Sequence, residues 1–112
     1  MSFNISCLLF AKDKDSRILM IQRSKSPNKG LWSPPGGKLE MILGESPYEC
    51  AKRESYEELG LELHDDDLHL FGYVSERNYE GGGHWLMFLF EIIPSLPALP
   101  RAINEGCFKF FS

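Results

Sequence analysis

The amino-acid sequence predicts an α/β domain, and three observations support this prediction. Residues 47–59 carry the start and stop signals of a helix at their two ends. Runs rich in β-branched and aromatic residues lie on both sides of that helix, as strands require. The chain has 112 residues, of which 43% are hydrophobic, and this length suits one core better than two. We therefore expect residues 1–112 to form a single domain.

The N-terminal part of the chain predicts two strands and a long loop. The segments are, in order, a strand at 3–11, a polar turn at 12–16, a strand at 17–23 and a loop at 24–30. We expect the two strands to pair as a hairpin. The loop contains Pro27, Asn28 and Gly30 as turn residues, and it is long enough to contact a substrate.

The central helix has well-marked ends. Ser46-Pro47-Tyr48-Glu49 is a capping box with proline at the first helical position, and Gly60 stands where a left-handed C-terminal residue is favoured. These signals predict a helix from Pro47 to Leu59.

One side of this helix carries three carboxylates. Glu54, Glu57 and Glu58 are spaced i, i+3 and i+4, so they project from the same side. Each like-charged pair at such spacing costs a helix roughly 0.2–0.5 kcal/mol, and no lysine follows four residues after any of them. We therefore expect a cation to relieve the repulsion.

The segment before the helix predicts a close approach to a ligand. Pro34-Pro35-Gly36-Gly37 combines a stiff entry with two residues that lack side chains, so that backbone groups can come near a bound molecule. Carboxylates and carbonyls are the ligands that Mg²⁺ prefers, usually with substrate phosphates and water.

After the helix, the chain alternates between strands and connectors. The predicted segments are an extended stretch at 61–63, an acidic turn at 64–67, a strand at 68–75, a flexible loop at 76–83, a strand at 84–93, an exposed proline-rich connector at 94–100 and a short strand at 107–111. The near-continuous apolar run at 84–93 indicates a strand buried on both faces, at the centre of the sheet. The connector contains three prolines and cannot be a helix or a central strand.

Composition limits the possible partners and compartments. The net charge of −4 argues against a broad surface for nucleic acid or anionic membrane. No run approaches the length of a membrane span, and the N-terminus lacks the basic leader of a signal peptide. Three cysteines without CxxC spacing suggest neither a disulfide framework nor a zinc site, so we expect a cytoplasmic protein.

These residues resemble the signature of the Nudix (MutT-type) hydrolases, GX5EX7REUXEEXGU, in which U is a bulky aliphatic residue. The matching positions, residues 37–61, are Gly37, Glu45, Arg53, Glu54, Glu57, Glu58, Gly60 and Leu61. Two features depart from the pattern. Seven residues rather than five separate Gly37 from Glu45, which indicates a two-residue insertion around Met41-Ile42-Leu43, and Ser55 stands where an aliphatic residue is usual.

The resemblance implies a Nudix fold, a mixed β-sheet sandwiched by helices. A long helix usually follows the last strand in this family, and the chain ends at Ser112 without one. Phe108, Phe110 and Phe111 would then finish the chain with no covering helix, so we expect self-association, such as a homodimer, over that strand.

The implied reaction is the hydrolysis of a diphosphate bond in a nucleoside diphosphate linked to another group X. The implied cofactor is Mg²⁺, with Mn²⁺ as the alternative. Glu54 and Glu58 are the first choice as metal ligands, with Glu57 sharing the site and the Gly36 carbonyl completing it. Arg53 would orient the carboxylates by pairing with them. The general base stays open: it is Glu54 or Glu57, or a loop residue among Glu76, Glu80 and Glu105.

Four further residues are candidates for binding the small-molecule nucleotide substrate: Arg23, Trp32, Gly37 and His84. Each of the three side chains also has a structural interpretation, because Arg23 could be a solvated strand end, Trp32 a packing residue and His84 a hydrogen-bonded structural histidine.

Two other interpretations of the whole chain compete with the enzyme. The first is a nucleotide-binding or regulatory Nudix module without turnover, which the missing helix and the widened loop favour. The second is a plain structural helix with an acidic solvated face, which would not explain the joint spacing of the glycines, Arg53 and the glutamates.

Overall fold

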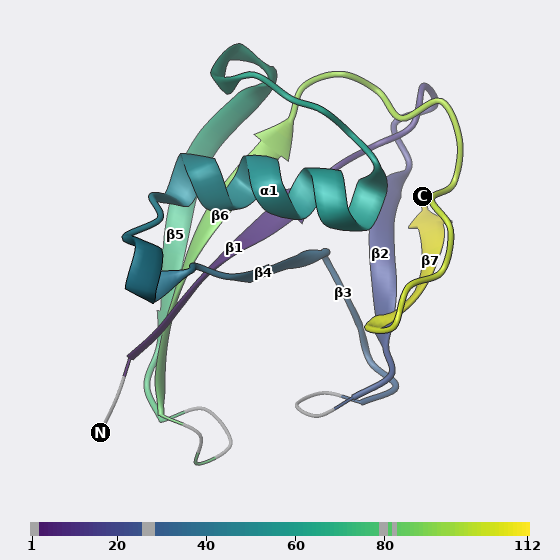
Figure 1. Ribbon diagram of the computed structural model, residues 1–112. Coiled ribbons are helices and arrows are strands. Elements are labelled where there is room, and N and C mark those ends of the chain that lie inside the picture. Colours follow the sequence, from purple (N-terminus) through teal and green to yellow (C-terminus); the bar gives the residue numbers. More distant parts are fainter. Residues whose placement is uncertain (1–2, 26–28, 79–80, 82) are drawn as a thin grey trace.

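A computed structural model describes residues 3–25, 29–78, 81 and 83–112. Its elements are, in chain order, β1 (Phe3–Phe10), β2 (Ile18–Arg23), β3 (Trp32–Ser33), β4 (Gly36–Lys38), the 3₁₀ turn η1 (Met41–Leu43), α1 (Pro47–Leu59), the 3₁₀ turn η2 (Asp65–Asp67), β5 (Leu68–Glu76), β6 (His84–Ile92) and β7 (Gly106–Phe111). Figure 1 shows α1 crossing in front of the strands.

The strands form two sheets. The first has the order β4-β1-β6-β5, in which β1 and β6 are parallel and the other neighbours are antiparallel. The second has the order β3-β2-β7 and is antiparallel throughout. The first sheet is therefore mixed, as the resemblance implies.

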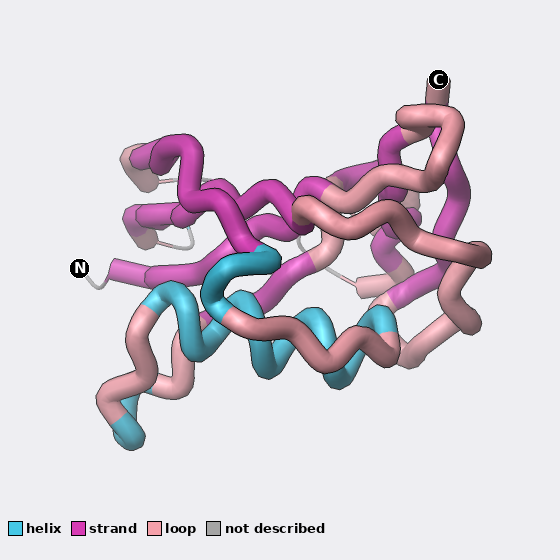
Figure 2. The backbone as a smooth tube through the Cα atoms, turned by 90° about the horizontal axis from the view of Figure 1, so that it is seen from above, coloured by secondary structure: helices cyan, strands magenta, loops and turns pink. Residues whose placement is uncertain are grey.

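The core lies between α1 and the sheets. Cys7 and Leu9 of β1 and Phe90 of β6 are fully buried beneath the helix, which contributes Cys50 and Ala51. Figure 2 shows α1 along one side of the strands. Among the described residues α1 is the only α-helix, and it covers one face of the mixed sheet. This part of the chain therefore contains one helical layer and not the two of a complete sandwich. No helix of the described chain is long and apolar enough to cross a membrane.

The predicted hairpin between residues 3–11 and 17–23 is wrong. The turn between them is present: the Leu19 N–H donates to the Ala11 carbonyl, and Lys12 and Ile18 form an isolated antiparallel β-bridge. The strands then separate into different sheets. Both edges of β1 are already paired, with β4 on one side and β6 on the other, so β1 has no free backbone groups for β2.

The strand at 84–93 lies inside the sheet, as predicted, but it is not buried on both faces throughout. β6 is paired with β1 and β5, and Phe90 and Ile92 are fully buried. Residues 84–89 are only half-buried, whereas Phe90, further along the strand, packs against Tyr48 of α1. The connector at 94–100 also differs from its prediction at one residue: Leu96 is buried, and its N–H donates to the Lys12 carbonyl.

The aromatic C-terminal strand is better covered than the sequence suggests. Its register opposite β2 puts Phe108 beside Ile21 and Phe110 beside Leu19, on the inner face of the second sheet. Phe108 is buried and Phe110 packs against the core. The expectation that these rings lie uncovered is therefore wrong for both of them.

Candidate active site

The ends of α1 fix the position of its carboxylates. The Ser46 Oγ accepts a hydrogen bond from the Glu49 N–H at 3.1 Å, and the Glu49 carboxylate accepts one from the Ser46 N–H at 2.8 Å. Gly60 closes the helix in the left-handed conformation, with φ of 70°. The helix therefore has the predicted bounds.

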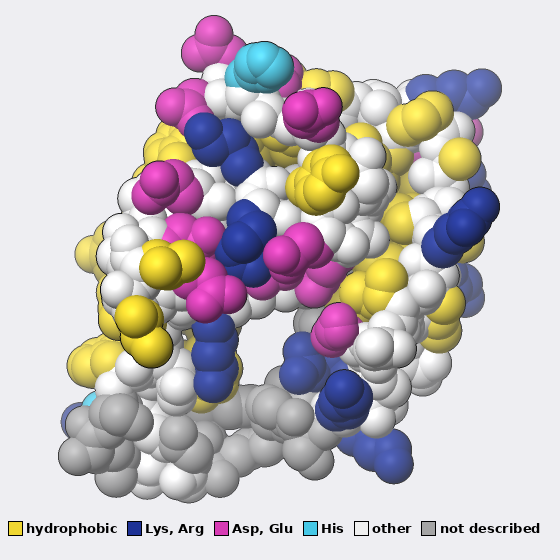
Figure 3. Space-filling model, in the orientation of Figure 1, with side chains coloured by type: hydrophobic (Ala, Val, Ile, Leu, Met, Phe, Trp, Pro, Cys, Tyr) yellow, Lys and Arg dark blue, Asp and Glu magenta, His cyan; other side chains and the backbone are white. Residues whose placement is uncertain are grey.

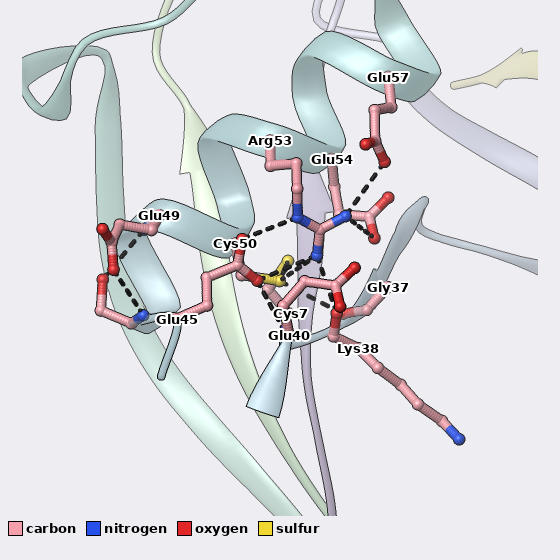
Figure 4. A network of polar contacts seen from close by, with 11 residues as sticks. Cys7, Gly37, Lys38, Glu40, Glu45, Glu49, Cys50, Arg53, Glu54 and Glu57 are labelled. Atoms are coloured by element: carbon pink, nitrogen blue, oxygen red, sulfur yellow. Dashed lines mark hydrogen bonds and ion pairs between the residues drawn. The ribbon is translucent and has the colours of Figure 1, made fainter. Parts of the chain in front are cut away.

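Arg53 binds three carboxylates at once (Figure 4). Its guanidinium donates to both oxygens of Glu45, at 2.7 and 3.0 Å, in the forked geometry that arginine favours. The Nη1 atom donates to Glu54 at 3.2 Å and to Glu57 at 3.1 Å. The Nη2 atom also donates to the Lys38 carbonyl at 3.0 Å. Arg53 thus supplies a cation that relieves the repulsion along α1 and ties the helix to β4.

Because Gly37 has no side chain, the Glu54 carboxylate can lie directly against the backbone at this position. A Cβ on Gly37 would stand 2.0 Å from the Glu54 Oε2, so no other residue fits there without moving the carboxylate. Glu54 is buried, with 9% of its surface exposed. The sequence suggested a close backbone approach to a ligand at this point, and in the structure the backbone approaches a side chain of α1.

Glu58 contacts the same backbone segment, one residue earlier, at Gly36. Its Oε1 accepts a hydrogen bond from the Gly36 N–H at 3.2 Å. Burial, followed by the nearby charges of Glu54 and Glu105, raises the pKa of Glu58 to about 8. Burial also raises the pKa of Glu54, although Arg53 opposes that shift. Two adjacent, partly desolvated carboxylates are costly in their ionised form unless a cation joins them.

The donor set fits a hard divalent cation. Glu54 and Glu58 place carboxylate oxygens beside the Gly36-Gly37 backbone, and Glu105 lies close enough to raise the Glu58 pKa. The described part of the chain holds no ready-made cluster of three acidic, histidine or cysteine donors, and Glu57 is engaged by Arg53. Mg²⁺ needs only one or two protein carboxylates, because water and substrate phosphates complete its shell.

The other predicted site residues are spread over the molecule. Arg23 ends β2 opposite Gly106, next to Glu105. The Trp32 ring packs on Phe111, with centroids 5.1 Å apart. The His84 Nδ1 accepts a hydrogen bond from the Asn78 N–H at 3.0 Å, and its ring lies on Phe3. Glu76 pairs with Trp85 at the end of β5. Glu80 lies outside the described residues.

A hollow lies beneath α1. In Figure 3 acidic side chains lie above it and basic side chains on either side of it. A separate depression, of about 520 Å³, lies between Lys52 and the acidic turn at 64–66. Two of its lining residues, Lys52 and Asp65, form an ion pair of 2.8 Å, and none of the carboxylates described above lines it.

Comparison with known proteins decides the family. The family model described as NUDIX domain matches residues 3–107. The chain belongs to the Nudix hydrolase family. An ADP-ribose pyrophosphatase of Methanocaldococcus jannaschii is 36% identical over 78 residues, which are 70% of this chain and 44% of that protein. The chain thus spans less than half the length of this relative.

Solved structures of other Nudix proteins have the same fold. A MutT NUDIX hydrolase from Burkholderia pseudomallei superposes with a TM-score of 0.79 at 27% identity, covering 99% of this chain and 84% of that one. The NUDIX domain of Shewanella oneidensis NrtR, solved in complex with ADP ribose, superposes with a TM-score of 0.72 at 20% identity. That comparison covers 97% of this chain and 71% of the other chain.

The two departures from the Nudix signature have visible structural results. The extra residues before α1 form η1, in which the side chain of Ile42 is fully exposed. Ser55 is fully buried, and its Oγ has no hydrogen-bond partner among the described residues.

Sequence reasoning missed two contacts of this Nudix site. The first is the ion pair between Glu45 and Arg53. Glu45 belongs to the signature, but it lies in a loop and Arg53 in the helix, so helical spacing does not predict that the two side chains meet. The second is a pair of buried thiols, Cys7 and Cys50, whose Sγ atoms lie 3.3 Å apart beneath Gly37. The Arg53 and Glu57 pair, by contrast, could have been read from its i, i+4 spacing.

Proposed function

We propose that this protein hydrolyses a diphosphate bond in a nucleoside diphosphate linked to a group X, with Mg²⁺ or Mn²⁺ as cofactor. The observation that carries the proposal is the pair of carboxylates, Glu54 and Glu58, held against the Gly36-Gly37 backbone, with the charge of Glu105 near enough to act on Glu58. Both carboxylates have a raised pKa because of burial and proximity, so a divalent cation is the partner that best stabilises their ionised forms.

Each residue has a distinct proposed role. Glu54 and Glu58 would hold the metal, with the Gly36 carbonyl as a further ligand, and Glu57, which contacts Arg53, would share the site. When bound, the metal supplies neutralisation of the phosphate charge and activation of water. Arg53 positions Glu54 and Glu57 because it is itself anchored on Glu45 and on the Lys38 carbonyl.

A carboxylate must also accept the proton of the attacking water. Glu54 and Glu57 stay candidates for this base, and among the loop residues the structure favours Glu105. Its charge acts on Glu58, and its carbonyl is held by the Ser24 N–H at 2.9 Å, which fixes the loop. Glu76, by comparison, is paired in the sheet opposite Trp85.

The relatives suggest which substrate to test first. One is named an ADP-ribose pyrophosphatase and another is a domain solved with ADP ribose. We therefore propose ADP-ribose as the leading compound of a panel that also includes nucleoside triphosphates, dinucleoside polyphosphates and nucleotide sugars. A reducing, cytoplasmic setting is consistent with the free thiols of Cys7, Cys50 and Cys107.

The test is turnover of this panel by the wild-type protein and by Glu58→Gln. Glutamine keeps the size of the side chain and removes a charge and a metal ligand, and loss of one preorganised group commonly costs about 10²–10³ in rate. Glu62→Gln is the matched control, because Glu62 is exposed and lies beyond the end of α1. We expect the Glu58 variant to remain folded and lose nearly all turnover, and the Glu62 variant to keep it.

The alternative is a nucleotide-binding module without turnover. It would be supported if the wild-type protein bound a nucleotide but hydrolysed no compound of the panel with Mg²⁺ or Mn²⁺, and if Glu58→Gln left that affinity unchanged. The same result would exclude the hydrolase.

A further inference from the structure

Lys38 and Trp85 make a contact that the proposed reaction does not use. The Lys38 Nζ lies 5.3 Å from the centroid of the Trp85 ring, which is the geometry of a cation–π contact. Lys38 is exposed and Trp85 is half-buried. One face of the indole is therefore covered by a flexible side chain that can leave it, and not by the core.

The strand register puts both side chains on the face of the first sheet that is turned away from α1. Lys38 pairs with Ser6 and Trp85 pairs with Asn4, and these two residues of β1 are two apart, so they share a face. Gly37, one residue before Lys38, lies on the other face, toward the carboxylates of α1. Lys38 and Trp85 thus flank β1 from either side.

Lys38 connects this face with the carboxylate site. Its carbonyl accepts the hydrogen bond of 3.0 Å from Arg53, while Figure 4 shows its side chain running away from α1. Because β4 is the edge strand of the first sheet, a ligand passing round this edge would meet the carboxylates on one face. On the other face it would meet the Lys38 ammonium and then the Trp85 indole. A molecule with a phosphate group and an aromatic ring matches this order.

We propose that Trp85 is the stacking platform for the base of a nucleotide substrate, and that Lys38 moves from the indole to a phosphate when the nucleotide binds. Every base has a π face that an indole can stack on, and an ammonium binds a phosphate more strongly than a ring. This inference rests on the proposed function, since it takes the substrate to be a nucleotide. It assigns the base to Trp85 and not to Trp32, which packs on Phe111 in the second sheet.

Tryptophan fluorescence tests the assignment, because the chain has 2 tryptophans and each can be removed in turn. Trp32→Phe leaves Trp85 as the reporter, and Trp85→Phe leaves Trp32. With AMP, GMP, CMP and UMP, each measured with and without Mg²⁺, we expect at least one nucleotide to quench Trp85. Ribose 5-phosphate, which has no base, should not. A response of Trp32 alone, or no response in either variant, would overturn the proposal.

Affinity measurements separate stacking from general damage. Trp85→Leu should weaken binding of the quenching nucleotide about tenfold or more, as expected for the loss of one stacked base. Tyr73→Leu is the matched control, because Tyr73 is an exposed aromatic residue on the same sheet that pairs with Phe88, on the α1 side. Equal losses in both variants would contradict a specific platform.

The role of Lys38 is tested by Lys38→Met, which keeps the apolar stem and removes the charge. We expect this change to weaken binding of the nucleotide but not of the corresponding nucleoside, which lacks the phosphate. An equal loss for both ligands would refute the assigned role. Quenching of Trp85 without hydrolysis of any compound would refute the hydrolase alone, whereas hydrolysis with an unresponsive Trp85 would refute this inference alone.

Discussion

Arg53 is the residue that lets three glutamates share one side of α1. Its forked pair with Glu45 holds the guanidinium in place, and its Nη1 then reaches both Glu54 and Glu57. Within the described chain Glu58 makes no contact with Arg53; its carboxyl group is hydrogen-bonded to the Gly36 N–H and to Glu54 instead. Two of these carboxylates therefore shift in opposite directions: the pKa of Glu45 is lowered by Arg53, and the pKa of Glu58 is raised by burial.

The raised pKa of Glu58 predicts how the metal-free protein responds to pH. A carboxyl group whose pKa is about 8 in the folded state and near 4.5 when unfolded binds its proton more tightly in the folded state. Its contribution to stability is complete below about pH 4.5 and is lost as the pH rises through 8. We therefore expect the melting temperature of the metal-free protein to decrease as the pH is raised from 4.5 to 8.

Glu58→Gln should remove most of that slope. Glutamine resembles the protonated carboxyl, because its carbonyl can accept from Gly36 and its amide can donate to Glu54, and it does not titrate. Thermal melts from pH 4.5 to 8 check this, with Glu62→Gln as the control. A slope that is identical in wild type and in Glu58→Gln would contradict the assignment of the titration to Glu58.

Gly37 predicts a loss of activity without a comparable loss of fold. A methyl group at this position would collide with the Glu54 carboxylate, whose only escape is to move away from its place beside Glu58. Gly72→Ala is the matched control, since its nearest neighbour, Leu89, would be 4.0 Å away. We expect Gly37→Ala to lower turnover at least tenfold, on the scale of a misplaced catalytic group, and Gly72→Ala to keep it.

At the scale of elements, α1 was predictable and the pairing of strands was not. The signals for the ends of α1 are local, because the capping box and the glycine act within a few residues of one another. The partners of β1 come from β4 and from β6, which is about 80 residues away, and no local pattern in β1 selects them over β2. For the same reason, the burial of Phe108 depends on a register with β2 that only the fold reveals.

Two serines of α1 predict stability changes of opposite sign. Ser46 caps the helix, and Ser46→Ala should cost about 1 kcal/mol. Ser55 is fully buried, and its hydroxyl lacks a partner within the described chain, so Ser55→Ala removes an unpaired polar group and improves helix propensity. We expect it to stabilise the protein by about 1 kcal/mol. Denaturant unfolding of both variants measures the two changes, and destabilisation by Ser55→Ala would show that its hydroxyl has a partner after all.

At the scale of the whole molecule, the site lies where β4, α1 and the loop before β7 meet. Gly36 and Gly37 come from the first sheet, the glutamates from α1 and Glu105 from the loop leading to β7 of the second sheet. The signature predicted the first two contributions, because they are contiguous in sequence. It left Glu105 as one of three loop candidates, since the position of its loop depends on the pairing of β7 with β2, which no local pattern shows.

Self-association stays a prediction, but its expected location changes. Phe108 and Phe110 face the core, whereas Met41, Ile42 and Leu43 of η1 are exposed by 60%, 100% and 81%. Three adjacent apolar side chains at this exposure are unusual on a soluble surface.

A divalent cation should stabilise the whole molecule, because its proposed ligands come from elements that separate on unfolding. Preferential binding to the folded state contributes about 2.7 kcal/mol when the free metal is at 100 times its dissociation constant. A proton on Glu58 competes with the metal, so the rise in melting temperature at a fixed Mg²⁺ concentration should be larger at pH 8.5 than at pH 6. Scanning calorimetry at both values, with ionic strength matched by NaCl, measures this difference. Glu58→Gln removes both a ligand and the competing proton, so it should show a smaller shift with little dependence on pH. If Mg²⁺ raised the melting temperature of wild type and variant equally at both values, the cation would bind elsewhere, and Glu58 would not be one of its ligands.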